Sequence, residues 1–92
     1  MADLYFDVEA DRALTVLEAD VTRSQLAERI RVVLDALAED PSQAWLRRHR
    51  FQIGLWGVSA RGSAEDWIVL WEPYPETGDA VIVQYIGPSS FG

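Results

Sequence analysis

The most hydrophobic stretch of the chain is a run of Trp, Ile, Val, Leu and Trp in its second half. A run this short, rich in β-branched and aromatic residues, predicts a strand covered on both faces. Successive side chains of a strand point to opposite faces, so we expect two sets. One set is Trp67, Val69 and Trp71, and the other is Ile68 and Leu70. The rest of the chain must therefore cover a sheet.

Three more segments have strand patterns. Leu4, Phe6 and Val8 alternate with polar residues, which predicts a strand with one solvent-facing side near the edge of the sheet. Residues 51–59 and 80–86 are largely apolar and are bounded by turns rich in Gly and Pro, including a turn at residues 60–64. The side chains expected to share one face of the last strand are Val81, Val83 and Tyr85.

Between the first two strands the apolar positions recur at helical spacing. This periodicity predicts a short helix over residues 10–19 and a longer one that ends at Asp40-Pro41, because the residue before proline is disfavoured in a helix. The apolar stripe of the longer helix consists of Leu26, Ile30, Val33, Leu34 and Leu37. Only about two residues join the helices, so we expect an antiparallel hairpin that covers one face of the sheet.

The start of the longer helix has a capping signature. Thr22 is expected as the N-cap residue, with Gln25 at the spacing of a capping box. Val21 and Leu26 occupy the positions of a hydrophobic staple. These signals predict a helix that begins at Thr22.

The element order is therefore β-α-α-β-β-β, which predicts an α+β fold in one domain of residues 1–92. We expect an antiparallel sheet with the helical hairpin packed on one face. The second face is then left for a partner strand or a second copy of the chain. Trp56 and Trp71 are expected to be partly exposed on that face, where they would mark a partner or ligand surface.

Composition limits the chemistry of the site. The chain has no Cys and one His, His49, so it contains neither a disulfide framework nor a thiolate or multi-histidine metal site. We therefore expect no metal and no cofactor. No apolar run reaches the length of a membrane span and no basic, apolar leader is present, which predicts a soluble, cytoplasmic protein without a membrane partner.

The charge is distributed unevenly. The formal net charge of −7 argues against a general affinity for nucleic acid. Residues 41–61 nevertheless contain four arginines and no acidic residue, whereas residues 1–40 and 62–92 are both acidic overall. The members of this basic island are Arg47, Arg48, Arg50 and Arg61.

Three interpretations of the basic island remain open. It binds phosphate or carboxylate groups, it is a solvated loop that balances nearby acids, or it receives an acidic segment of a partner or second copy. His49 is a candidate general base, although a lone histidine among arginines is more often incidental. Tyr85 is a candidate proton donor, and its alternation with Val81 and Val83 favours a packing role.

Several segments resemble the RelE/ParE superfamily of bacterial toxins. They are LYFDVEADRALTVL, LAERIRVVLDALAEDP, LWGVSARGSAEDWIVLWEP and AVIVQYIG. The resemblance implies the same fold and a toxin of a type II toxin–antitoxin system, neutralised by an antitoxin protein. It implies either ribosome-dependent cleavage of mRNA, in which the ribose 2′-OH attacks the adjacent phosphate, or inhibition of DNA gyrase.

If the protein is such an endoribonuclease, the resemblance implies that Arg61, Arg48 and Arg50 bind and polarise phosphate while Tyr85 carries the proton. The family typically has an arginine two or three residues before the glycine of its last strand; here Gln84 and Tyr85 stand there, and no basic residue follows. The alternative is a non-catalytic module on the same scaffold, a possible homodimer, that binds protein or ligand through the uncovered sheet face.

Overall fold

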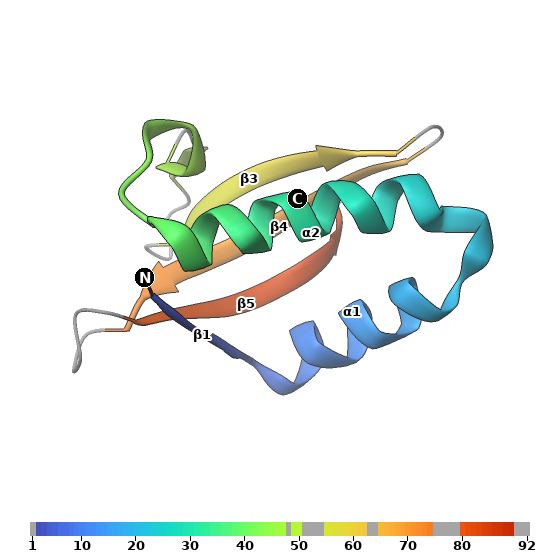
Figure 1. The fold of residues 1–92 in the computed structure, drawn as a ribbon, viewed down its shortest axis with the longest axis horizontal. Helices are drawn as coiled ribbons and strands as arrows, with labels where there is room; N and C mark the ends of the chain where they lie inside the picture. The colour runs from blue at the N-terminus through green and yellow to red at the C-terminus, as the bar shows by residue number, and fades with distance from the viewer. Residues whose placement is uncertain (1, 48, 51–54, 63–64, 75–79, 90–92) are drawn as a thin grey trace.

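The computed structural model describes residues 2–47, 49–50, 55–62, 65–74 and 80–89. It shows two helices on one side of a sheet (Figure 1), which confirms the α+β class. In chain order the elements are β1 (Asp3–Phe6), α1 (Val8–Ala19), the 3₁₀ turn η1 (Val21–Arg23), α2 (Ser24–Glu39), the 3₁₀ turn η2 (Ala44–Arg47), β2 (His49–Arg50), β3 (Trp56–Arg61), β4 (Asp66–Pro73) and β5 (Ala80–Pro88).

Among the described residues, the sheet has five strands in the order β1-β5-β4-β3-β2. The strands β2 to β5 pair in antiparallel fashion, but β1 lies parallel to β5. The prediction of a purely antiparallel sheet was therefore wrong. A parallel pair needs a long connection, and every other element of the chain lies between β1 and β5. The two-residue strand β2 was not predicted.

The helices pack on one face of the sheet. Figure 1 shows α2 in front of the strands and α1 below β5, running in the opposite direction. All five residues of the predicted stripe on α2 are buried, and they share a core with Trp67, Val69 and Trp71 of β4. The predicted stripe on α2 and the predicted set of side chains on one face of β4 are therefore both confirmed. Burial of this stripe stabilises the packing of α2 on the sheet, because it removes apolar area from water.

The face away from the helices is not open at its centre. Ile68 and Leu70 are only 5% exposed, and they form a second apolar cluster with Leu55 and the partly buried Tyr85. The prediction that this face of the sheet is apolar and freely accessible was therefore wrong.

The expected exposure of Trp71 on that face was wrong, whereas Trp56 is partly exposed but packs on the helix side. Trp71 is 0% exposed, lies on the helix side and pairs across the sheet with Trp56, which packs against the same core.

An irregularity between β4 and β5 changes which side chains share a face. Leu70 pairs with Tyr85 whereas Trp71 pairs with Val83, so Gln84 is an extra residue in β5. Such a bulge reverses the alternation beyond it. Tyr85 therefore lies on the opposite face from Val83, and the prediction that they share a face was wrong.

The start of α2 differs from the prediction. Asp20, not Thr22, caps the turn η1, since its carboxylate accepts from the Thr22 backbone N–H at 3.0 Å. The helix then begins at Ser24 without a side-chain cap. Val21 is 86% exposed, so it forms no staple. Asp20 replaces Thr22 as the capping residue because its carboxylate also accepts a hydrogen bond from the Thr22 hydroxyl, which is then engaged as a donor.

Candidate binding site at the open edge of the sheet

In the part of the chain that the structure describes, most of the outer edge of β3 has no paired neighbour. The described part of β2 pairs with Trp56 and Gly57 at the beginning of β3. Within the described residues, no strand lies beside the last four residues of β3, Val58 to Arg61. An unpaired edge presents backbone N–H and C=O groups that can pair with another chain.

The hydrogen bonds of β4 show which peptide groups of β3 are free. Gly62 N–H donates to the Glu65 carbonyl at 2.9 Å, and on the other side of β4 Ser89 N–H donates to the Asp66 carbonyl at 3.0 Å. Since bonding alternates along an antiparallel pair, alternate residues of β3 bond to β4. The peptide groups of Val58 and Ala60 face β4, and those of Ser59 and Arg61 face outward.

A groove of about 510 Å³ runs beside this edge. It is lined by Arg29, Val32 and Val33 of α2, by Trp45 of η2 and by residues 57–61 of β3. Val32 is 47% exposed and Trp45 is 37% exposed, so both apolar walls are accessible. The open edge therefore adjoins a space with apolar walls that can receive side chains of an added strand.

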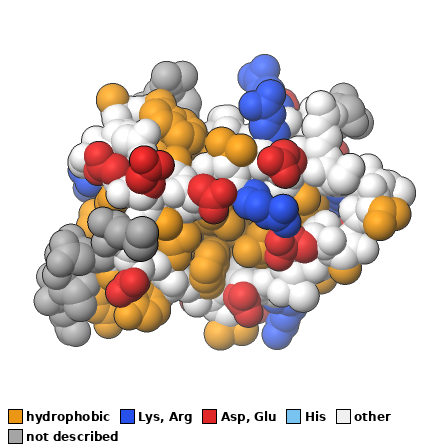
Figure 2. Space-filling model, in the orientation of Figure 1, with side chains coloured by type: hydrophobic (Ala, Val, Ile, Leu, Met, Phe, Trp, Pro, Cys, Tyr) orange, Lys and Arg blue, Asp and Glu red, His pale blue; other side chains and the backbone are white. Residues whose placement is uncertain are grey.

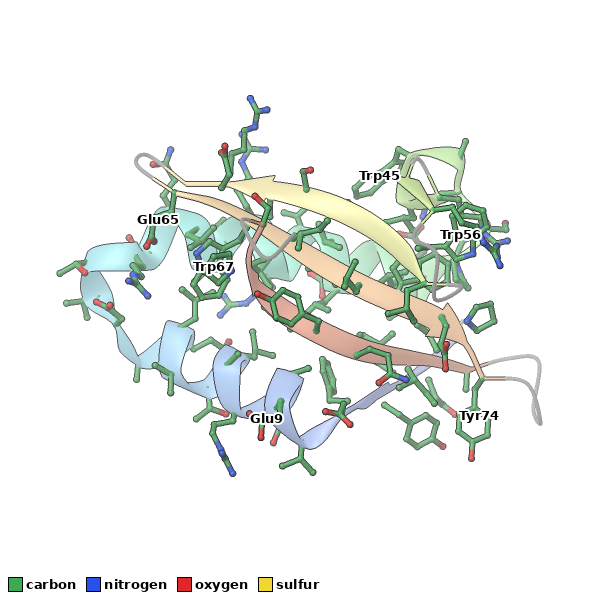
Figure 3. All side chains as sticks on the ribbon, turned by 180° about the vertical axis from the view of Figure 1, so that it is seen from behind. Glu9, Trp45, Trp56, Glu65, Trp67 and Tyr74 are labelled. Atoms are coloured by element: carbon green, nitrogen blue, oxygen red, sulfur yellow. The ribbon has the colours of Figure 1, made fainter. Side chains whose placement is uncertain are left out.

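The groove has a cationic end and an apolar end. A Cβ atom at Gly62 would lie 3.1 Å from the Cβ of Leu26, so the beginning of α2 lies over the end of β3. The helix and the strand run in opposite directions (Figure 1), which places Arg29 toward Arg61. Figure 3 shows Trp45 beside Trp56, where β3 begins.

The molecular surface shows the same arrangement of an apolar end and a cationic end. In Figure 2, hydrophobic side chains gather toward the η2 end of the upper edge, and arginine side chains lie further along it.

The two arginines of the groove are available to an anion. Arg61 pairs with Asp66 at 3.5 Å, but the two side chains are 79% and 64% exposed, and such a surface pair is weak. Within the described part of the chain, Arg29 has no ion pair. With two arginines against the one carboxylate of Asp66, this end of the groove is a local positive site in an acidic protein.

The structure does not gather the basic island into one patch. The Arg50 guanidinium lies 4.5 Å from the centre of the Trp56 ring, and that of Arg47 lies 5.5 Å from the rings of both Trp56 and Trp71. Stacking on aromatic faces stabilises guanidinium groups. Arg47 and Arg50 therefore join an aromatic cluster at the start of β3, whereas Arg61 lies at its other end.

Two predicted residues lie outside this description. Arg48 is not among the described residues, and the side chain of His49 is not described although its backbone forms part of β2.

Tyr85 is separated from Arg61. The strand β4 lies between β3 and β5, so two interstrand spacings, about 9–10 Å, separate their backbones. The Tyr85 hydroxyl donates to the Pro88 carbonyl at 2.9 Å and lies against Gly87. The backbones of the predicted phosphate binder and the predicted proton carrier therefore lie two strands apart.

Comparison with known proteins adds no relative to this description. No family model, no curated protein and no solved structure matches the chain. Among the described residues, no helix combines the length and the hydrophobicity needed to cross a bilayer.

Sequence reasoning missed two groove residues, Arg29 and Val32. Val32 is an apolar residue next to the buried stripe of α2 but outside it. An apolar side chain in that position, on a helix whose other outer residues are mostly polar, was the available signal. The sequence contained no signal for Arg29, because its position in the groove depends on how α2 packs over β3.

Proposed function

We propose that this protein is a partner-binding module that receives an extended segment of another protein as an additional strand along β3. The observation that carries the proposal is the pair of outward-facing peptide groups, Ser59 and Arg61, beside an accessible groove. In strand addition, backbone hydrogen bonds provide affinity, and pockets for alternate side chains provide specificity.

The composition of this edge supports the proposal. Proteins commonly protect exposed edges with charged side chains, proline, a bulge or a covering element. The open part of β3 reads Val-Ser-Ala-Arg, so its one charged residue is at the end, it has no proline, and its pairing with β4 has no bulge. Its small residues, Ser59 and Ala60, leave room for a second backbone to approach.

The toxin of a type II toxin–antitoxin system is a second candidate function, with the antitoxin as the source of the added strand. One observation favours mRNA cleavage: Arg29 and Arg61 both line the groove beside β3, and a guanidinium group can bind phosphate. The carboxylate of Asp66 beside Arg61 opposes phosphate binding, and Tyr85 lies two strands away.

Induced expression in a bacterial host that lacks any antitoxin tests this second candidate. An mRNA-cleaving toxin would arrest translation and growth, and Arg61→Ala would restore both. Unimpaired growth and translation at high expression would exclude the toxin activity. Arrest that persists in the Arg61→Ala variant would exclude the assignment of Arg61.

A matched pair of variants tests the binding proposal. Ser59→Pro removes an outward N–H without removing a hydrogen bond to β4, whereas Ser59→Ala keeps that N–H. Linear peptides selected from a displayed library against the full chain should bind the wild type and Ser59→Ala, and should lose at least ten-fold in affinity for Ser59→Pro. Circular dichroism verifies that both variants fold. Equal affinity for all three proteins, or no selected peptide, would overturn the proposal.

A further inference from the structure

We propose that the added segment runs antiparallel to β3 and carries, from its N-terminal side, two acidic residues, one unrestricted residue and one large apolar residue. This inference rests on the proposed function, because it specifies the segment that the open edge receives. It follows from the polarity of the groove and from the alternation of side chains along β3.

The direction follows from the pairing of β3. Antiparallel pairs are slightly more stable per residue than parallel pairs, and both described neighbours of β3 are antiparallel to it. Ser59 and Arg61 can each exchange both backbone hydrogen bonds with a residue of an antiparallel segment. The segment therefore enters at the Arg61 end and leaves toward Trp45.

The faces of the segment follow from the faces of β3, since residues directly opposite in two strands project to the same side. Val58 and Ala60 belong to the core on the helix side. Ser59 and Arg61 alternate with them, so they project to the other side.

Each position of the segment therefore has a different environment. The residue opposite Arg61 faces its guanidinium, and the residue opposite Ala60 projects under α2 toward Arg29, so both are acidic. The residue opposite Ser59 projects to the side away from α2 and is unrestricted. The residue opposite Val58 projects between Val32 and Trp45, where a large apolar side chain removes the most surface from water.

Charge sharpens the selection. The chain carries a net charge of −7, so the protein as a whole repels an acidic segment, whereas Arg29 and Arg61 attract it to their end of the groove. Discrimination against a basic segment comes from placing like charges beside Arg29 and Arg61. Because these arginines are near solvent, the preference should weaken as the ionic strength rises.

Three fluorescent ten-residue peptides, titrated against the full chain by fluorescence anisotropy, test the motif. Their cores are Glu-Glu-Thr-Leu, the reversed Leu-Thr-Glu-Glu and the basic Lys-Lys-Thr-Leu. The forward acidic peptide should bind at least ten-fold more tightly than either of the others. The Arg29→Glu/Arg61→Glu double variant should reverse the preference between the acidic and basic forward peptides.

The same titrations separate the two proposals. Equal affinity for the forward and reversed peptides, lost in Ser59→Pro for both, would overturn the motif and leave strand addition intact. If a library-selected peptide binds the edge but none of the three designed peptides does, the motif would likewise be overturned and strand addition would stand. Binding of the forward peptide that is unchanged in Ser59→Pro would overturn both proposals.

Discussion

The indole N–H of Trp71 donates a hydrogen bond to the backbone carbonyl of Leu46, with 3.0 Å between the two atoms. Both side chains are 0% exposed, and the Arg47 guanidinium stacks on the Trp71 ring. The bond joins η2 to the centre of the sheet. It therefore fixes the segment that carries Trp45, one wall of the groove.

Replacing Trp71 by Phe should destabilise the protein, because the Leu46 carbonyl is left buried without its donor. An unsatisfied buried group costs about 1–3 kcal/mol, and the smaller ring adds a packing loss. Urea unfolding followed by circular dichroism measures the change. Trp45→Phe is the control, since its indole bonds to Gln43 near the surface and should cost less than about 0.5 kcal/mol. Equal costs for the two variants would contradict the role of the buried bond.

Gly87→Ala should displace the Tyr85 ring. An added Cβ would lie 2.6 Å from the Tyr85 hydroxyl oxygen and 2.8 Å from the adjacent ring carbon, which is too close. The ring must move, and its bond to the Pro88 carbonyl is lost, at about 0.5–1.5 kcal/mol. Unfolding of the single variants and of Gly87→Ala/Tyr85→Ala measures the coupling. The glycine substitution should cost less in the Tyr85→Ala background, and an unchanged cost would show that no clash exists.

Acid should remove stabilisation at both ends of α2. The Thr22 hydroxyl, and then the Thr22 backbone N–H, hold the pKa of Asp20 below its ordinary value of 3.8. Ser42 lowers the pKa of Asp40 in the same way. A lowered carboxylate pKa stabilises the fold above 3.8, and this contribution disappears as the pH falls through the lowered value.

Thermal melts between neutral pH and pH 2 measure this contribution. Asp20→Asn and Asp40→Asn should each flatten the fall of the melting temperature below pH 4, and the double variant should flatten it further. An acid profile identical to the wild type would show that neither carboxylate is linked to folding.

The local pattern of apolar and polar residues was sufficient to predict the helices and the central strand. The stripe on α2 and the two faces of β4 could be predicted because burial follows a fixed period of 3.6 or 2 residues. The bulge at Gln84 and the parallel pairing of β1 with β5 could not, since both depend on how distant strands meet. The cap was missed because Asp20 and Thr22 were both suitable, and only the conformation of the turn selects between them.

Only part of the candidate site was visible in the sequence. Arg61 stood out because it follows a predicted strand in a basic segment. Its neighbours in the groove, Arg29 and Val32, come from a helix about 30 residues earlier, and only packing brings them together. The free edge itself could not be predicted, because it depends on how far the neighbouring strand extends along β3, and within the described residues β2 pairs with only its first two residues.

Native-state hydrogen exchange of the free protein, followed residue by residue by NMR, tests the open edge most directly. The amides of Val58 and Ala60, bonded to β4, should exchange slowly, and those of Ser59 and Arg61 should exchange at nearly the rate of an unstructured peptide. Protection of Ser59 and Arg61 equal to that of Val58 and Ala60 would show that the edge is already paired, and would contradict the account.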